Sequence, residues 1–149
     1  MTLNNKLIKS TLLTIIQYSI LIYLMITLIW FSSNIWLIII QFTGFIIALW
    51  AIIEMNKGKI NIAPSIRKEA ILITSGPYKY IRHPMYLSLI LIITPSIITY
   101  YTSWLLIIYI IFIINLILKL LFEESLLKTH FTSYKEYMEK SWRLFPYIF

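Results

Sequence analysis

Four long apolar stretches leave this chain few options for its fold. Residues 11–31, 35–53 and 84–101 contain no charged residue, and residues 104–122 contain only Lys119. A helix needs ~20 apolar residues to cross the ~30 Å hydrocarbon core of a bilayer. The composition agrees, because 60% of the residues are hydrophobic and 13% are charged, against about 25% charged residues in a soluble domain. The sequence therefore predicts an all-α, polytopic membrane protein with about four transmembrane helices.

The first stretch could instead be a signal peptide, because Lys6 and Lys9 precede it. However, the run is longer than the ~7–15 apolar residues of a signal peptide, and no small-residue cleavage site follows it. We therefore expect a membrane helix that forms an N-terminal hairpin, residues 1–55, with the second stretch. Gly44 and Ala48 of that stretch stand four residues apart, a pair that would let another helix approach closely. The whole chain, 1–149, is predicted to form a single membrane domain whose functional core is residues 56–149.

The basic residues are distributed unevenly along the chain. All 13 Lys and Arg lie before the first stretch, between the second and third, or from the end of the fourth onward. By the positive-inside rule, both termini and the central loop are predicted to be cytoplasmic. The net charge of +7 then reflects topology and contact with anionic membrane lipid, so no nucleic-acid partner is expected.

The remaining ionisable groups gather on the same predicted side. All six glutamates and both histidines fall there, and the chain has no cysteine. These counts exclude disulfides and thiolate chemistry and predict no metal site. Any polar chemistry is therefore expected at a single face of the membrane.

Two segments on this face carry candidate functional residues. In the first, Pro84 suits the first turn of a helix, which would place His83 beside backbone donors that can hold an anion. In the second, Lys119 and Glu123 are four residues apart and share a helical face. Charges so close to hydrocarbon are costly and usually functional. Alternatively, Lys119 snorkels to the headgroups and the glutamates simply begin the solvated tail.

The tail after Glu124 is predicted to be an amphipathic helix at the membrane interface. Leu127, Phe131, Tyr134 and Met138 recur at helical spacing between charged residues. This pattern is typical of a helix that lies in the plane of the interface.

The order of these motifs resembles the isoprenylcysteine carboxyl methyltransferase family, which is related to the phospholipid N-methyltransferases. The resemblance covers roughly residues 56–149, and the shared architecture is a polar motif, two apolar spans and a second polar motif. The matching elements are Gly76-Pro77-Tyr78, Arg82-His83-Pro84-Met85-Tyr86, Glu123-Glu124, Tyr134, Tyr137, Arg143 and Pro146.

This resemblance implies a membrane-integral methyltransferase that uses S-adenosylmethionine, without a metal, at the cytoplasmic face. The acceptor would be a lipophilic or lipidated molecule, either a prenylcysteine-like carboxylate or a lipid. Lys119 would face the acceptor, although it stands where the family has arginine, and lysine cannot grip a carboxylate bidentately. The resemblance assigns cofactor binding to Ala70, Ile71, Leu72, Ile73, Tyr78, His83, Pro84, Met85, Tyr86 and Glu123.

Two other functions are compatible with a small polytopic chain. A non-catalytic membrane scaffold or lipid-binding protein could carry the same spans. A four-helix transporter is less favoured, because ion coupling usually needs an acidic residue within a span, and the first three stretches contain none. The sequence leaves the acceptor, the methylated atom (O, N or S) and the oligomeric state open.

Overall fold

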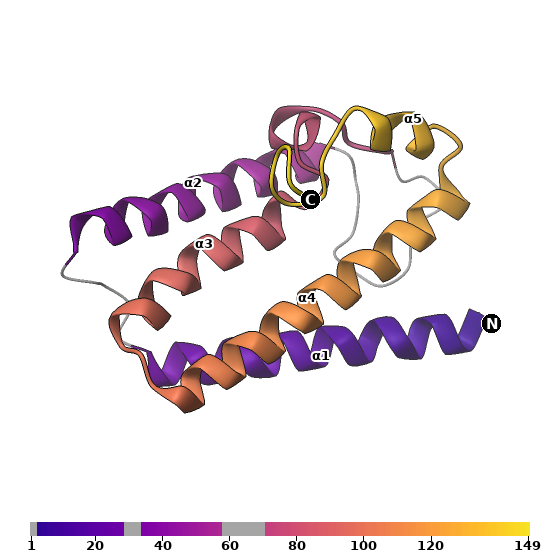
Figure 1. The fold of residues 1–149 in the computed structure, drawn as a ribbon. Helices are drawn as coiled ribbons and strands as arrows, with labels where there is room; N and C mark the ends of the chain where they lie inside the picture. Colours follow the sequence, from indigo (N-terminus) through magenta and orange to yellow (C-terminus); the bar gives the residue numbers. More distant parts are fainter. Residues whose placement is uncertain (1–2, 29–33, 58–70) are drawn as a thin grey trace.

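Four apolar helices form the body of the protein, and a smaller helical segment covers one end (Figure 1). A computed structural model describes residues 3–28, 34–57 and 71–149. Every regular element in these ranges is helical, which confirms the predicted all-α class. The elements are α1 (Leu3–Thr27), α2 (Ile35–Lys57), the 3-10 helix η1 (Gly76–Lys79), α3 (Pro84–Thr99), α4 (Ser103–His130) and α5 (Tyr134–Glu139).

Three of these helices, α1, α2 and α4, are long and apolar enough to cross a membrane. The fourth, α3, has 16 residues, so at ~1.5 Å per residue it is shorter than the ~30 Å hydrocarbon core. Large apolar side chains cover the outward surfaces, and Ile26, Trp36 and Trp104 are 79%, 72% and 62% exposed. Such exposure suits contact with lipid, because a protein surrounded by water would bury apolar side chains of this size.

Helix α4 extends further than predicted. It continues through Glu123 and Glu124 to His130, whereas hydropathy placed the end of the apolar span at Phe122. The predicted tail helix is accordingly divided, since Leu127 belongs to α4 and a separate α5 begins at Tyr134. Helix α5 is amphipathic as expected, because it buries Tyr134 and exposes its charged residues.

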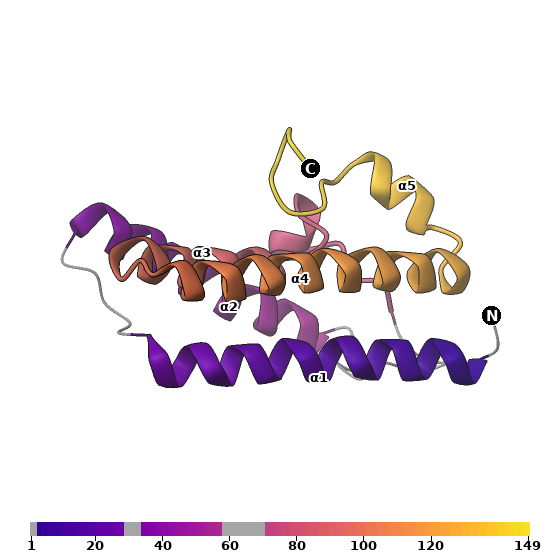
Figure 2. The same cartoon turned by 60° about the horizontal axis from the view of Figure 1, so that its bottom comes forward.

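The helices pack in two pairs, α2 against α3 and α1 against α4, and α3 also contacts α4 (Figure 2). Gly44 permits the first contact, because a Cβ atom there would lie 3.0 Å from the Ser88 carbonyl oxygen and 2.9 Å from Ile92 Cγ1. The predicted close approach at Gly44 is thereby confirmed. Nearby, the Gln41 side chain donates to the Ile92 carbonyl at 3.0 Å and to Ser96 Oγ at 2.9 Å.

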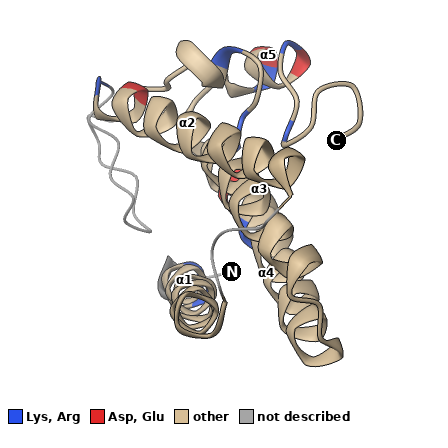
Figure 3. Ribbon diagram, turned by 90° about the vertical axis from the view of Figure 1, so that its left-hand side faces the viewer, with Lys and Arg blue, Asp and Glu red and all other residues tan. Residues whose placement is uncertain are grey.

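The C-terminal segment is bonded to the chain just before α3. An isolated parallel bridge joins Ile81 to Trp142, and the Arg82 N–H donates to the Trp142 carbonyl at 2.7 Å. Figure 3 shows charged residues gathered at the end of α2 and around α5. The polar elements therefore meet at one end of the bundle, where α3 begins and α4 ends (Figure 1).

Candidate functional site

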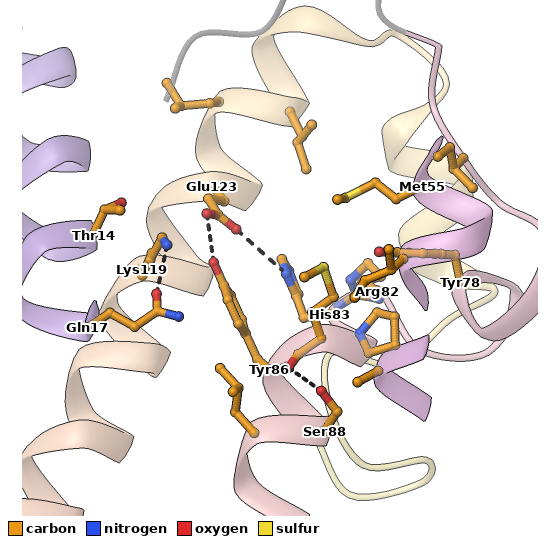
Figure 4. A pocket seen from close by; sticks show the side chains of 18 of the residues that line it. Thr14, Gln17, Met55, Tyr78, Arg82, His83, Tyr86, Ser88, Lys119 and Glu123 are labelled. Carbon is orange, nitrogen blue, oxygen red and sulfur yellow. Dashed lines mark hydrogen bonds and ion pairs between the residues drawn. The ribbon is translucent and has the colours of Figure 1, made fainter. Parts of the chain in front are cut away.

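A cavity of about 410 Å³ lies at this polar end of the bundle (Figure 4). Its volume falls in the range of about 300–1,000 Å³ that is usual for small-molecule sites. All four long helices, the segment before α3, and α5 contribute to its walls. The residues that line it include Ser10, Thr14, Gln17, Leu21, Ile52, Leu72, Ile73, Tyr78, Arg82, His83, Pro84, Met85, Tyr86, Lys119, Glu123, Tyr134 and Tyr137.

Glu123 is the centre of the first cluster in this cavity. The Tyr86 hydroxyl donates to Glu123 Oε1 at 2.7 Å, and His83 Nδ1 lies 3.9 Å from Glu123 Oε2. The His83 and Tyr86 rings are stacked, with centroids 5.4 Å apart, with His83 at the N-cap of α3 and Tyr86 in its first turn. The Glu123 side chain is 34% exposed, so its carboxylate is accessible to a ligand in the cavity.

Lys119 lies one helical turn before Glu123 and is buried, with 7% of its surface exposed. Its Nζ donates to Gln17 Oε1 of α1 at 2.7 Å and lies 5.7 Å from the centroid of the Tyr86 ring. The expectation that Lys119 and Glu123 share one helical face is consistent with these contacts. The alternative of a snorkelling Lys119 is wrong, because the side chain turns into the cavity instead of toward water.

Tyr78 reaches the cavity from η1, which is held on both sides. The Ser75 hydroxyl donates to Glu54 Oε2 of α2 at 2.7 Å, and the Tyr137 hydroxyl donates to the Tyr78 carbonyl at 2.5 Å. Between them, Gly76 adopts a φ of +57°, and a Cβ atom there would lie 2.4 Å from Glu54 Cγ. Glycine is therefore required both by the left-handed backbone and by the close approach of Glu54.

Burial makes the tyrosines of this wall unusually weak acids. It raises the pKa of Tyr78 to about 12, and the negative charge of Glu123 adds to the effect. Burial likewise raises the pKa of Tyr134 and of Tyr137. Loss of solvation disfavours the phenolate, so these rings are neutral phenols throughout the physiological pH range.

A buried ion cluster supports the site from behind. Arg82 Nε donates to Glu124 Oε1 at 2.8 Å, and Arg143 Nε donates to Glu124 Oε2 at 3.1 Å. Arg82 also donates to the carbonyls of Met138 and Ser141. The cluster thus joins α4, the segment before α3 and the C-terminal tail, a role that the motifs did not indicate for Arg82 and Glu124.

Most of the predicted cofactor residues share this cavity. Leu72, Ile73, Tyr78, His83, Pro84, Met85, Tyr86 and Glu123 all line it, as does Lys119. Ile71 differs, because it is 62% exposed and is absent from the cavity wall. The prediction for Ala70 concerns a position outside the described residues.

The start of α3 offers fewer backbone donors than expected. The His83 N–H donates to the Arg143 carbonyl and the Tyr86 N–H donates to the His83 carbonyl, both at 3.1 Å, and Pro84 has no N–H. The expected anion site on the backbone is therefore largely occupied by the protein itself. His83 instead presents its side chain, whose Nε2 is buried without a hydrogen bond in the described part of the chain, 3.7 Å from Glu124 Oε1.

Helix α1 supplies a wall that the motifs did not indicate. Ser10, Thr14 and Gln17 line the cavity, and their spacing of four and three residues places them on one helical face. This polar stripe in an otherwise apolar run was the available sequence signal. Within the residues that the structure describes, no cluster of histidine and acidic side chains is suited to hold a metal ion.

Comparison with known proteins gives one finding. A family model described as phospholipid methyltransferase matches residues 35–134. This range includes α2, η1, α3, α4 and the beginning of α5, while α1 lies outside it. No curated protein and no solved structure matches the chain.

Proposed function

The chain belongs to the phospholipid methyltransferase family, and from this premise we propose that it transfers a methyl group from S-adenosylmethionine to a lipophilic acceptor at the cytoplasmic face. The arrangement that carries the proposal is the convergence of Tyr78, His83, Tyr86 and Glu123 on one cavity. This cavity joins a polar end to apolar walls. A hydrophilic donor and a lipophilic acceptor could therefore meet in it.

The chemistry requires alignment more than acid–base assistance. Bound S-adenosylmethionine would supply a methyl group on a sulfonium, which an acceptor's lone pair would take as the carbon–sulfur bond broke and left its electron pair on sulfur. Orientation of two reactants can contribute about 7–11 kcal/mol to such a step. The roles of the protein are then to hold both molecules in line and to exclude water.

The residues of the cavity suit the parts of this donor. The partly exposed carboxylate of Glu123 can accept hydrogen bonds from an amino group or from ribose hydroxyls. The neutral rings of Tyr78 and Tyr86 can pack on adenine or face a sulfonium through their π-electrons.

The side chains of His83 and Tyr134 also line this part of the cavity. Leu72 and Ile73 supply the apolar part of the same wall.

Binding of labelled S-adenosylmethionine to the protein purified in a neutral detergent tests the proposal. We expect binding by the wild type and at least tenfold weaker binding by Glu123→Gln and His83→Ala. Glu136→Gln serves as the matched control, because Glu136 is exposed on α5 and should bind normally. Folded wild-type protein that fails to bind the donor would defeat the proposal.

A second experiment separates an enzyme from a lipid-binding scaffold. Native membrane lipids and lipidated peptides are incubated with methyl-labelled donor and the wild-type protein, and labelled products are identified. A methyltransferase yields a labelled lipophilic product that the Glu123→Gln variant does not form. A scaffold yields none, even if it binds lipid.

A further inference from the structure

The segment that follows α5 ends in a turn that exposes apolar side chains. In this C-terminal turn, residues 144–149, Tyr147 and Ile148 are 88% and 83% exposed, and Phe145 and Phe149 are 37% and 38% exposed. Large apolar side chains gathered in one patch usually mark a surface that contacts another molecule or a membrane. The turn is therefore a candidate contact surface, separate from the cavity.

Contacts with the rest of the protein fix this turn in place. Leu144 is 4% exposed and belongs to the hydrophobic core cluster. The Leu144 and Phe145 N–H groups donate to the Phe149 carbonyl at 2.9 and 3.1 Å, and the Arg143 guanidinium lies 5.0 Å from the centroid of the Phe149 ring. The exposed side chains are thus presented by a closed loop with a buried anchor.

The backbone of the turn is also unusual. Tyr147 has a φ of +67°, which lies in the left-handed region that residues with a side chain adopt only at a cost. Such a conformation persists where the surroundings determine it, and here the Trp142 and Tyr147 rings are in contact, with centroids 4.7 Å apart. The fold therefore maintains a strained residue whose ring remains exposed, which is consistent with a role for that ring.

The turn lies beside the apolar helices and not beyond their ends. Figures 1 and 2 place it next to the start of α3, and in both views α1 and α4 continue past it toward the polar end of the bundle. Figure 2 also shows the turn standing clear of α4. Because α1 and α4 are apolar enough to cross a membrane, a turn that projects sideways at this level meets lipid.

The surroundings of the turn combine aromatic and basic groups. Residues 140–149 contain two basic residues and no acidic one. The Trp142 N–H donates to the carbonyl of Tyr80 at 3.0 Å, and Tyr80 is itself 53% exposed with Lys79 Nζ 5.6 Å from its ring centroid. Aromatic rings next to basic groups are typical of the headgroup level, where the rings contact acyl chains and the cations contact phosphates.

We propose that the C-terminal turn is a lipid-binding wedge, which inserts Tyr147 and Ile148 between the head groups and acyl chains of the leaflet at the polar end of the bundle. Interfacial elements of this kind bury their apolar side chains ~5–10 Å below the surface. The wedge also connects the lipid surface to the candidate site, because the His83 N–H donates to the Arg143 carbonyl at 3.1 Å, directly before the turn.

A fluorescent probe on the turn tests this proposal. The chain contains no cysteine, so Ile148→Cys can be labelled at a single position with the environment-sensitive fluorophore NBD. The full chain is reconstituted at low density into phosphatidylcholine vesicles that also contain nitroxide-labelled phosphatidylcholine, with the nitroxide near the top of the acyl chain or near its end. Ile46→Cys, 65% exposed in the middle of α2, serves as the deep control. Thr132→Cys, exposed between α4 and α5, serves as the aqueous control.

We expect blue-shifted emission at position 148 and at least twofold quenching by the shallow nitroxide, with weaker quenching by the deep one. Ile46→Cys should show the reverse order, and Thr132→Cys should be quenched little by either. Tyr147→Asp in the Ile148→Cys background should at least halve the quenching, because a charged side chain opposes insertion into hydrocarbon. Thr132→Asp in the same background adds the same charge elsewhere and should leave the quenching unchanged.

Two results would overturn the proposal. Water-like emission at position 148 without quenching would place the turn in water. Blue-shifted emission that neither nitroxide quenches would show that protein covers the turn, as in a contact between two copies of the chain. Each labelled variant is first required to show a single elution peak and the wild-type thermal midpoint, so neither result can arise from unfolding. The measurement does not involve the methyl donor, so its outcome is independent of the proposed function.

Discussion

The Tyr86 hydroxyl lies 2.7 Å from Glu123 Oε1 and donates a hydrogen bond to it. This contact joins the first turn of α3 to the final third of α4 inside the cavity. It also holds the Glu123 carboxylate in one orientation. The position of Glu123 is therefore set by a residue 37 positions away in the chain.

Removing that hydroxyl should weaken binding of the donor. Tyr86→Phe keeps the ring stacked on His83 but loses a hydrogen bond to a carboxylate, an interaction of about 1.5–3 kcal/mol. We expect the dissociation constant for S-adenosylmethionine to rise about tenfold, as measured by calorimetry, which corresponds to about 1.4 kcal/mol. Tyr147→Phe, at an 88% exposed position, should bind as the wild type does. Equal affinities of the two variants would show that Tyr86 does not orient Glu123.

Breaking the buried ion cluster should cost stability. The side chains of Arg82 and Glu124 are 6% and 2% exposed. Arg82→Met removes one of the two guanidinium groups that donate to Glu124 and leaves that of Arg143. Loss of one partner of a buried pair destabilises by about 3–5 kcal/mol, and we expect a clear fall in the unfolding midpoint in detergent. Lys135→Met, an exposed lysine on α5, should have no effect. A midpoint for Arg82→Met within error of wild type would contradict a supporting role.

A side chain at position 76 should disturb the loop that carries Tyr78. Gly76→Ala places a Cβ atom 2.4 Å from Glu54 Cγ on a backbone with φ of +57°. A left-handed conformation costs a non-glycine residue about 1–2 kcal/mol, and the clash adds to it. We expect a lower thermal midpoint and weaker donor binding, both measured against Thr132→Ala, at an exposed position. Unchanged stability would mean that Glu54 moves away freely.

The raised pKa of Tyr78 predicts a specific effect at alkaline pH. Burial raises this pKa to about 12 from the ordinary value of 10.0, so the folded state keeps a proton that the unfolded chain loses. The stability contributed by this phenol is complete below pH 10 and declines as the pH rises toward 12. Unfolding free energies measured at pH 9 and pH 11 should therefore fall more for the wild type than for Tyr78→Phe. Parallel losses in both proteins would show that Tyr78 titrates normally.

The distribution of Lys and Arg predicts the orientation of the chain. Reporter fusions placed after Phe149 and within residues 58–70 should report the cytoplasm, and fusions near Ser33 and Tyr101 should report the opposite side. Phosphatase fusions and fluorescent-protein fusions, used in parallel, give a positive signal for each side of the membrane. A cytoplasmic signal near Tyr101 would contradict the four-span arrangement.

Hydropathy and motif spacing predicted much of this molecule, for reasons that lie in single segments. The apolar runs set the helices, Gly44 indicated a close helix contact, and the four-residue spacing of Lys119 and Glu123 placed them on one face. The end of α4 was missed because hydropathy detects where lipid contact stops, while the backbone remains helical through Glu123 and Glu124.

Contacts between distant segments were not accessible from the sequence. Which glutamate pairs with Arg82, and which helix packs beside Lys119, depend on how α1, α4 and the tail meet in space. The expected pairing of the first two spans illustrates the difficulty, because α1 packs on α4 and α2 packs on α3. Short connections favour contacts between elements that are adjacent in sequence, but α1 packs on α4, and α2 and α3 lie between them in the chain.

The pairing of α1 with α4 has a consequence for biogenesis. Asn115 donates to the Leu13 carbonyl and Lys119 donates to Gln17, and in each case the partners are 102 residues apart. During synthesis α1 reaches the bilayer long before α4 exists, so its polar stripe must wait without these partners in a medium that offers no water. The pocket is accordingly among the last parts of the protein to form, because its α1 wall and its α4 wall meet only after both helices have been made.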